Sequence, residues 1–182
     1  PGRLLAWRIS KTLGLDIHDT QCGAKVFRAT AALAGGGALL DMGIYSLHAC
    51  CMAADANPVA VTAKELPKTQ PDFFKEVEQA MEFRLEFANG ATADVWTGYD
   101  ANRAEFRADA AKGWFKGERP VFSYSGLNIS TSAKGKLDFG VFRQQQRHMD
   151  GVAAAFRDEQ PVTCSGELGR RDMVIIDGIY ES

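Results

Sequence analysis

The most regular stretch of the chain is Met81-Glu-Phe-Arg-Leu-Glu-Phe87, which is followed by Asn89-Gly90 and by Ala91-Thr-Ala-Asp-Val-Trp-Thr97. Apolar and polar side chains alternate strictly in the first segment, the pattern of a strand with one buried face. Asn-Gly is the favoured pair for the two positive-φ residues of a type I′ turn. This stretch therefore predicts a β-hairpin, and with it a fold that contains antiparallel sheet.

The segments before the hairpin predict one helix and one strand. Apolar side chains recur at three- and four-residue steps between Ala38 and Ala53, which is typical of an amphipathic helix. Asn57-Pro58 ends this helix, because proline cannot continue its hydrogen bonds. Val59–Ala63 is then expected to be a strand. The expected buried stripe of the helix is Leu40, Ile44, Leu47 and Cys51.

The segments after the hairpin predict further strands and two closing helices. Strands are expected at Arg103–Ala108 and Val121–Tyr124, with a turn around Gly113–Pro120 between them. Helices are expected at Gln144–Glu159 and at Gly166–Ser182, the second capped by Ser165. Their expected buried stripes are Met149, Val152, Ala153 and Phe156, and Met173, Ile176 and Tyr180. The order of elements predicts an α+β fold with helices on one face of a large, mostly antiparallel open sheet.

The composition argues against several classes of function. A formal charge of −2 without a Lys/Arg cluster gives no electrostatic support for binding nucleic acid or an anionic membrane. No apolar run approaches the roughly 18 residues of a membrane span, and no signal peptide is recognised. The four cysteines form no CxxC pair, so we expect reduced thiols, no metal site and a cytoplasmic protein.

Three residues near the start of the first helix could carry chemistry. Asp41 and Tyr45 are four residues apart and His48 is three further on, so a helix projects all three from one face. An acid, a phenol and an imidazole on one strip can hold a sugar hydroxyl and accept its proton. The alternative is that they are solvated residues at the edge of an amphipathic helix. The preceding Gly35–Gly37 permits close approach of a backbone or a ligand, but it lacks the GxGxxG spacing of a dinucleotide site.

Several segments in the same order resemble one enzyme family. Leu33-Ala-Gly-Gly-Gly-Ala-Leu-Leu-Asp-Met-Gly-Ile-Tyr-Ser-Leu47 is similar to the signature helix of the Gfo/Idh/MocA oxidoreductases, especially the glucose–fructose oxidoreductase-like branch. Pro58–Ala63 resembles the strand that follows this helix, and Phe83–Gly90 resembles the family's hairpin. Gln145–Asp150 and Pro161–Ser182 resemble its last two helices. The resemblance covers about residues 33–182.

The resemblance implies a sugar or polyol oxidoreductase that uses NAD or NADP. In that family a Rossmann domain binds the cofactor, and we expect this domain to lie outside the chain, so the fragment would be inactive alone. Tyr45 would be the acid/base, and His48 and Asp41 would place the sugar hydroxyls. The family's sheet pairs with another subunit, which implies a homo-oligomer through a large apolar sheet face. The alternative is a non-catalytic sugar-binding or dimerisation module.

The first residues resemble a different family. Residues 3–30, above all Asp19-Thr-Gln-Cys-Gly-Ala-Lys25, are similar to part of the dolichyl-phosphate-glucosyltransferase-like family 2 glycosyltransferases. The expected domains are therefore 1–32, a segment of uncertain origin, and 33–182, the oxidoreductase substrate-binding and oligomerisation domain. A glycosyltransferase/oxidoreductase chimera is a second interpretation. Asp16, His18 and Asp19 are expected to form a solvated loop and not a metal site.

Overall fold

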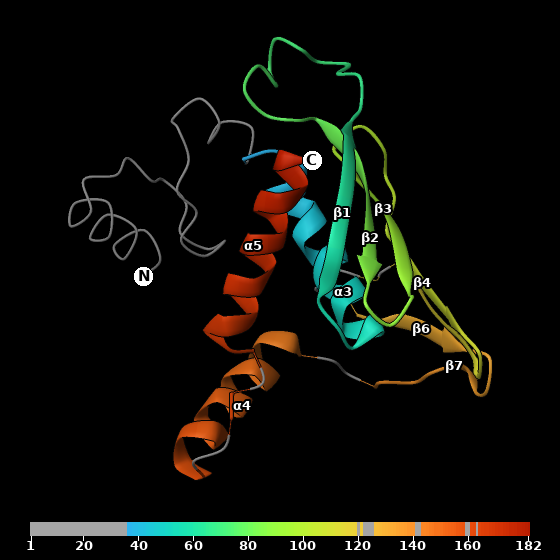
Figure 1. The fold of residues 1–182 in the computed structure, drawn as a ribbon. Helices are drawn as coiled ribbons and strands as arrows, with labels where there is room; N and C mark the ends of the chain where they lie inside the picture. Colours follow the sequence, from blue (N-terminus) through green and yellow to red (C-terminus); the bar gives the residue numbers. More distant parts are fainter. Residues whose placement is uncertain (1–35, 120, 122–125, 141–142, 159–160, 163) are drawn as a thin grey trace.

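The computed structural model of the chain describes residues 36–119, 121, 126–140, 143–158, 161–162 and 164–182. Figure 1 shows two helices, α3 and α5, lying along one face of strands β1, β2 and β3, as an α+β fold requires. The elements in chain order are η1 (Leu39–Gly43), α3 (Ile44–Ala54), β1 (Pro58–Glu65), β2 (Ala80–Phe87), β3 (Thr92–Gly98), β4 (Glu105–Ala110), β5 (Gly113–Glu118), β6 (Asn128–Thr131), β7 (Gly135–Lys136), α4 (Gln144–Asp158) and α5 (Gly166–Glu181).

The described strands form antiparallel sheets, which confirms the predicted fold class. One sheet has the order β1-β2-β3 and the other the order β4-β5-β6-β7. The predicted hairpin is present, with Phe83 opposite Val95 and Arg84 opposite Asp94. The alternation of β2 has the expected effect: Met81, Phe83, Leu85 and Phe87 are buried, and the residues between them are exposed.

The turn of the hairpin differs from the prediction. The Gly90 amide donates to the Phe87 carbonyl over 2.9 Å, so three residues, and not two, form the loop. Gly90 has a φ of 83°, whereas Asn89 has a negative φ. The turn is therefore of the three-residue kind, in which glycine occupies the left-handed position after the turn. The Asn89 side chain instead donates to the Ala54 carbonyl at the end of α3, over 3.0 Å.

The core lies between the two helices and the first sheet. Buried side chains from η1 and α3, from β2 and β3 and from α5 form one hydrophobic cluster: Leu39, Leu47, Cys50, Cys51, Met81, Phe83, Leu85, Phe87, Val95, Ile175, Ile176 and Ile179. Full burial of an aliphatic or aromatic side chain stabilises a fold by about 1.5–3 kcal/mol. This cluster consequently fixes α3 and α5 on the sheet.

The first helix begins with a π-helical turn, which the sequence did not predict. Residues Leu39–Gly43 form a π-helical turn, and the α-helix proper starts at Ile44. A π turn contains an extra residue, which rotates the buried face. Leu39 is therefore fully buried, whereas Leu40 and Ile44 are only partly buried. A side chain at Gly43 would lie 3.1 Å from Thr97 Cγ2, so this turn packs closely on β3.

The predicted stripes of the last two helices were largely wrong. In α5 the buried residues are Asp172, Ile175, Ile176 and Ile179. Of the predicted stripe only Ile176 is buried, whereas Met173 and Tyr180 are exposed. In α4 Met149 and Phe156 are 67% and 80% exposed, and only Ala155 is buried. An apolar periodicity identifies a helix face, but it does not say whether another element covers that face. Ser165 is the N-cap of α5 as predicted, without a side-chain hydrogen bond.

The second sheet corrects one further prediction. Gly113–Glu118, expected to be a turn, is strand β5, and it pairs with β4 and β6. The turn lies earlier, at Ala111 and Lys112, and Gly113 follows it with a φ of 139°. The predicted strand Val121–Tyr124 lies mostly outside the described residues. Arg103–Ala108 is confirmed in substance as β4, shifted by two residues.

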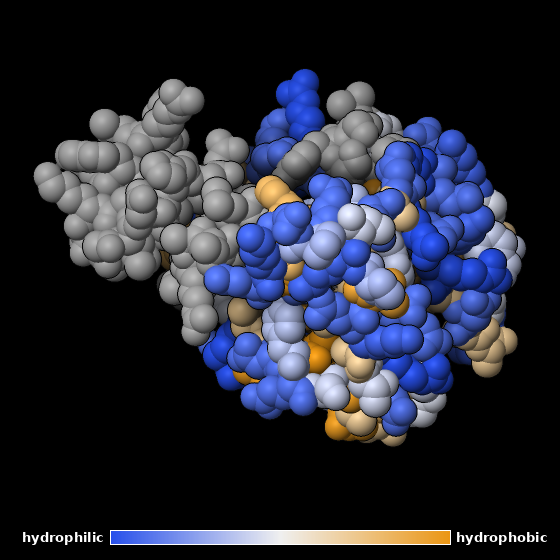
Figure 2. Space-filling model, turned by 90° about the horizontal axis from the view of Figure 1, so that it is seen from above, coloured by the Kyte–Doolittle hydropathy of each residue, from blue (hydrophilic) through white to orange (hydrophobic). Residues whose placement is uncertain are grey.

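The face of the β1–β3 sheet that α3 and α5 leave uncovered, here called the open face, is polar. Its side chains come from alternate positions of the three strands, all exposed except the half-buried Trp96: Thr62, Lys64, Glu82, Arg84, Glu86, Asp94 and Trp96. The expectation of a large apolar sheet face is thus wrong for these strands. Figure 2, a view from above, is likewise dominated by hydrophilic side chains, with hydrophobic ones in small groups. None of the helices in the described ranges combines the length and apolar composition that a bilayer crossing requires.

Candidate functional site

The chain enters the candidate site through a turn of two glycines. Gly36 and Gly37, here called the glycine turn, have φ angles of 82° and 92°, which residues with a side chain rarely adopt. A Cβ atom at Gly37 would lie 2.4 Å from the Glu78 carboxylate. Glycine is therefore required both for the backbone conformation and for the close approach of this acid.

The Glu78 carboxylate lies next to the glycine turn and binds the start of the helix. It accepts a hydrogen bond from the Leu39 amide over 2.7 Å and one from the Tyr180 hydroxyl over 3.1 Å. Glu78 is 5% exposed, and this burial raises the pKa of its carboxyl, although the Leu39 bond lowers it in part. Because an acid occupies the space beneath the glycine turn, the turn does not cradle a phosphate.

Asp41, in the π turn, is held from the end of β3. The Tyr99 hydroxyl donates to Asp41 Oδ2 over 2.9 Å and lies 3.3 Å from the Gly37 carbonyl oxygen. Burial, and then the neighbouring Asp41, raise the pKa of Tyr99, so its hydroxyl stays protonated at neutral pH. The carboxylate of Asp41 is thus oriented by a phenol that is 58 residues away in the chain.

Tyr45 lies one helical turn further on and borders a cavity of about 810 Å³, here called the α3 cavity. Its side chain is 53% exposed. Residues of and next to β3, β4 and β5 also line it, and they include three cationic side chains, Arg103, Arg107 and Lys116, and three acidic ones, Asp94, Glu105 and Asp109. Arg107 is paired with Asp109, and Lys116 with Glu118. A phenol beside an accessible cavity can exchange a proton with a ligand that is bound there.

His48 faces the other helix. Its Nδ1 atom lies 2.8 Å from Asp172 Oδ2 and 3.1 Å from Arg171 Nη2, both on α5. The Asp172 carboxylate is 4% exposed, and Arg171 donates to its second oxygen over 2.8 Å. A buried carboxylate requires such partners. These contacts make His48 part of the joint between α3 and α5.

The three residues predicted from spacing therefore have different surroundings. Asp41 contacts the residue after β3, Tyr45 borders the α3 cavity, and His48 contacts α5. Asp41 lies within the π turn, whereas Tyr45 and His48 lie on the regular helix that follows it. Their catalytic roles stay predictions.

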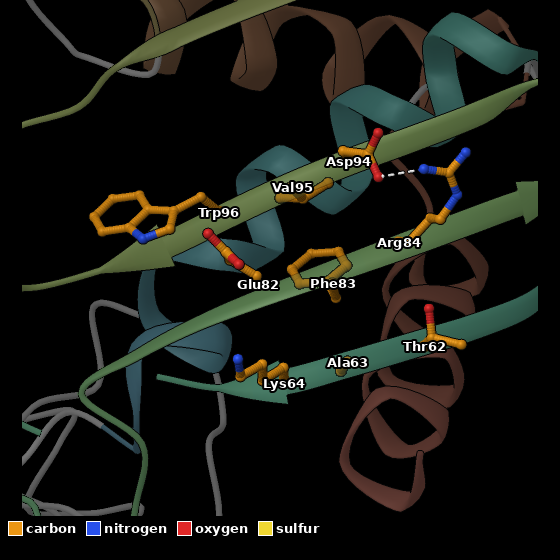
Figure 3. A pocket seen from close by; sticks show the side chains of 9 residues that line it. All are labelled: Thr62, Ala63, Lys64, Glu82, Phe83, Arg84, Asp94, Val95 and Trp96. Atoms are coloured by element: carbon orange, nitrogen blue, oxygen red, sulfur yellow. Dashed lines mark hydrogen bonds and ion pairs between the residues drawn. The ribbon is translucent and has the colours of Figure 1, made fainter. Parts of the chain in front are cut away.

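A second hollow, of about 510 Å³, lies on the open face, and none of these three residues lines it. In Figure 3 Lys64, Glu82 and Trp96 project from three neighbouring strands, and Arg84 is paired with Asp94 over 2.8 Å. Arg103 covers the Trp96 ring at 4.5 Å from its centroid. Exposed ion pairs of this kind contribute about 0–1 kcal/mol, so they give the face polarity more than stability.

Glu78, Tyr99 and Asp172 were not identified from the sequence. A faint signal existed for Asp172, because it lies three and four residues before Ile175 and Ile176 on a helical stripe. Tyr99 directly follows the last residue of the hairpin, where strand ends often carry functional side chains. Glu78 precedes β2 and gives no pattern of its own. Their partners are distant in the chain, so spacing alone could not reveal them.

The described residues include no group of three or more His, Cys, Asp or Glu side chains that could hold a metal ion. Asp16, His18 and Asp19 lie outside the described residues. Burial, and to a lesser extent Cys51, raise the pKa of Cys50 to about 12, so this thiol is not a nucleophile at neutral pH. Cys50 and Cys51 are buried free thiols, whereas Cys164 is exposed.

Comparison with known protein families gives one match. Residues 8–116 fit a model described as the GFO/IDH/MocA C-terminal domain. The match begins within the segment 3–30 and continues across the expected boundary at residues 32 and 33. The comparisons do not support the glycosyltransferase resemblance, and the division into 1–32 and 33–182 stays a prediction.

Comparison with individual proteins gives similar oxidoreductases. A structure of aldose-aldose oxidoreductase from Caulobacter crescentus, complexed with glycerol, is 32% identical with a TM-score of 0.76, covering 87% of this chain and 49% of that one. The D-xylose 1-dehydrogenase [NADP(+)] of Haloarcula marismortui is 24% identical over 86% of this chain and 44% of its own length. A UDP-N-acetylglucosamine 3-dehydrogenase from Acidithiobacillus ferrooxidans shares the fold, at 16% identity and a TM-score of 0.65, over 85% of this chain and 49% of that one. The chain thus spans about half the length of these relatives.

Proposed function

Because this chain belongs to the GFO/IDH/MocA family through its C-terminal domain, we propose that it is the substrate-binding part of an NAD(P)-dependent sugar or polyol oxidoreductase. The observation that carries the proposal is the 32% identity, over 87% of the chain, to an aldose-aldose oxidoreductase. The NADP(+)-dependent xylose dehydrogenase supports the same class of cofactor and substrate. The chain spans about half of either relative. We therefore assign the activity to the whole protein and expect this chain to be inactive alone.

The proposed reaction is hydride transfer between a carbohydrate carbon and a nicotinamide ring. The cofactor, when bound, supplies the hydride acceptor or donor. In the oxidation direction the substrate hydroxyl loses its proton to the Tyr45 oxygen as the carbon loses its hydride, and the alcohol becomes a carbonyl. Asp41 accepts a hydrogen bond from a substrate hydroxyl and so fixes the sugar. Two observations on the described residues support a role on the substrate side: Tyr45 borders the α3 cavity, and Tyr99 donates a hydrogen bond to Asp41.

Tyr45 needs a positive neighbour for this role. An unperturbed tyrosine has a pKa of about 10, and a nearby cation favours the phenolate. Arg103, Arg107 and Lys116 line the same cavity as Tyr45, but Asp94, Glu105 and Asp109 line it too, so the lining carries equal numbers of positive and negative side chains. A cation close to the Tyr45 hydroxyl is therefore a requirement of the proposal. His48 has a different role in the proposal: its contact with Asp172 fixes the helix that carries Tyr45 and Asp41.

The test is an assay of the full-length protein with NAD⁺ and NADP⁺ against a panel of aldoses and polyols. Tyr45→Phe is expected to lower kcat by about 100-fold or more, because it removes the group that moves the proton. Met52→Leu is the matched control, since Met52 lies on the same helix and is 68% exposed. It should keep wild-type activity.

The outcomes separate the claims. Activity of Tyr45→Phe equal to wild type would remove Tyr45 from the chemistry but leave the function. Wild-type protein that binds sugars without turnover of either nicotinamide would favour the non-catalytic module. Neither turnover nor sugar binding would contradict both.

A further inference from the structure

Two contacts, besides those of its hydroxyl, hold Tyr99 in the fold. It directly follows β3, and its amide donates to the Gln79 carbonyl over 3.1 Å. Its ring stacks on Phe74 at a centroid distance of 5.5 Å and an interplanar angle of 20°. Phe74 is 4% exposed, so the ring of Tyr99 rests on a fixed surface. The position of the Tyr99 hydroxyl is therefore set independently of the helix that it contacts.

The Tyr99 hydroxyl can only be the donor in its hydrogen bond with Asp41. An ionised carboxylate only accepts hydrogen bonds, and a phenol has one proton to donate. The Tyr99 hydroxyl lies 2.9 Å from Asp41 Oδ2 and 3.3 Å from the Gly37 carbonyl oxygen, so we infer that it donates its hydrogen bond mainly to the carboxylate. A bond to a charged acceptor is also stronger than one to a carbonyl.

We propose that Tyr99 is a positioning residue for substrate binding: its hydroxyl fixes the carboxylate of Asp41 in the orientation that receives a sugar hydroxyl. Asp41 lies in the π turn, where the backbone departs from regular helix, so its side chain is not aligned by helical geometry alone. Holding one oxygen from outside the helix removes a rotation that substrate binding would otherwise have to freeze. The inference rests on the proposed function.

Another phenol of the chain provides a matched comparison. Tyr180 also donates to a carboxylate, that of Glu78, over 3.1 Å. Glu78 in turn binds the Leu39 amide in the π turn that carries Asp41. Tyr180→Phe thus removes a similar bond close to the same turn without touching Asp41. A merely structural role for Tyr99 predicts that both Phe variants behave alike.

The experiment compares four variants of the full-length protein: Tyr99→Phe, Asp41→Asn, their double mutant and Tyr180→Phe. The measurements are KM and kcat for the best aldose or polyol and the thermal unfolding midpoint. Tyr99→Phe is expected to raise KM about tenfold with little change in kcat, the fold-change of one lost charged hydrogen bond. Tyr180→Phe should keep the wild-type KM. The double mutant should be no weaker in binding than Asp41→Asn, because Tyr99 acts through Asp41.

Three results would overturn the inference. A KM of Tyr99→Phe equal to that of Tyr180→Phe would reduce Tyr99 to a structural residue while the proposed function stands. Additive effects of Tyr99→Phe and Asp41→Asn would show that Tyr99 does not act through Asp41. Absence of any sugar turnover by the wild-type protein would remove the proposed function, and the inference with it.

Discussion

Glu78 illustrates how a single buried acid supports the candidate site. Its carboxylate receives the Leu39 amide and the Tyr180 hydroxyl and leaves no space for a side chain at Gly37. Burial disfavours the charged form and raises the pKa of this carboxyl above its ordinary value near 4.5. Folding consequently favours the protonated acid, which makes stability depend on pH.

Replacing Glu78 by Gln should change that dependence. For an acid with a raised pKa in the folded state, the unfolded chain ionises first as pH rises, so stability falls from the ordinary pKa up to the folded pKa. Glu78→Gln lacks this loss. The difference in unfolding free energy between variant and wild type, from urea denaturation at several pH values, should therefore shift in favour of the variant above pH 4.5. The exposed Glu82→Gln is the control, and a similar shift in it would contradict the assignment.

Gly37→Ala should destabilise the fold strongly. The new Cβ would lie 2.4 Å from the Glu78 carboxylate, at a φ of 92°. Overpacking and backbone strain each cost about 1–3 kcal/mol, so we expect a loss of at least about 2 kcal/mol in urea denaturation. Gly169→Ala is the control, since Gly169 lies in α5 with open space around it. It should be neutral or stabilise by up to about 1 kcal/mol.

At the scale of elements, α3 and α5 are joined by a polar contact inside an otherwise apolar interface. His48 and Arg171 surround the Asp172 carboxylate, while Ile175, Ile176 and Ile179 continue the same face of α5. By contrast, α4 buries only Ala155 among its described side chains. The two closing helices thus differ in how far each is fixed by packing, although both have an apolar stripe in the sequence.

Asp172→Asn should loosen α5 from α3. The amide keeps the shape of the acid but loses its charge, so the bonds from His48 and Arg171 weaken inside a buried site. We expect a loss of about 1–3 kcal/mol in unfolding free energy. Asp177→Asn, at an exposed position of the same helix, should change stability by less than about 0.5 kcal/mol. Equal effects of both variants would mean that the contact with His48 contributes nothing.

For the whole molecule, the open face raises the question of assembly. Its Lys64, Glu82, Arg84 and Asp94 side chains show that apolar surface does not drive pairing there. Charged rows of both signs can still pair with a second copy by complementarity. We therefore still propose a homo-oligomer through this sheet, but through charge complementarity and not through burial of apolar surface.

Reversing one charge on that face tests the proposal. Arg84→Glu would place an acid beside Asp94 and between acidic neighbours, and it should shift the protein toward monomer by light scattering at matched concentration. Arg157→Glu on α4 reverses another exposed arginine that is also paired with an aspartate, Asp158, and should leave the mass unchanged. Wild-type protein that is monomeric at high concentration would contradict assembly through this face.

Local patterns in the chain were sufficient for most of the elements. The alternation of Met81–Phe87 and the helical spacing before Asn57-Pro58 depend on neighbours within a few residues, and their secondary structure was predicted correctly. The π turn, strand β5 and the exposed stripe of α4 were not, because they depend on what packs against them. Periodicity describes a face, and only a neighbouring element decides whether it is buried.

The same distinction holds for the candidate site. The motif around Asp41 and Tyr45 was visible in the sequence because it lies on a single helix. Its partners were not visible, since the bonds to Asp41 and His48 come from residues 58 and 124 positions away. Residues so far apart in the chain are brought together by the burial of the common core, which packs β3 and α5 against α3. Tertiary structure therefore decided which side chains hold the motif in place.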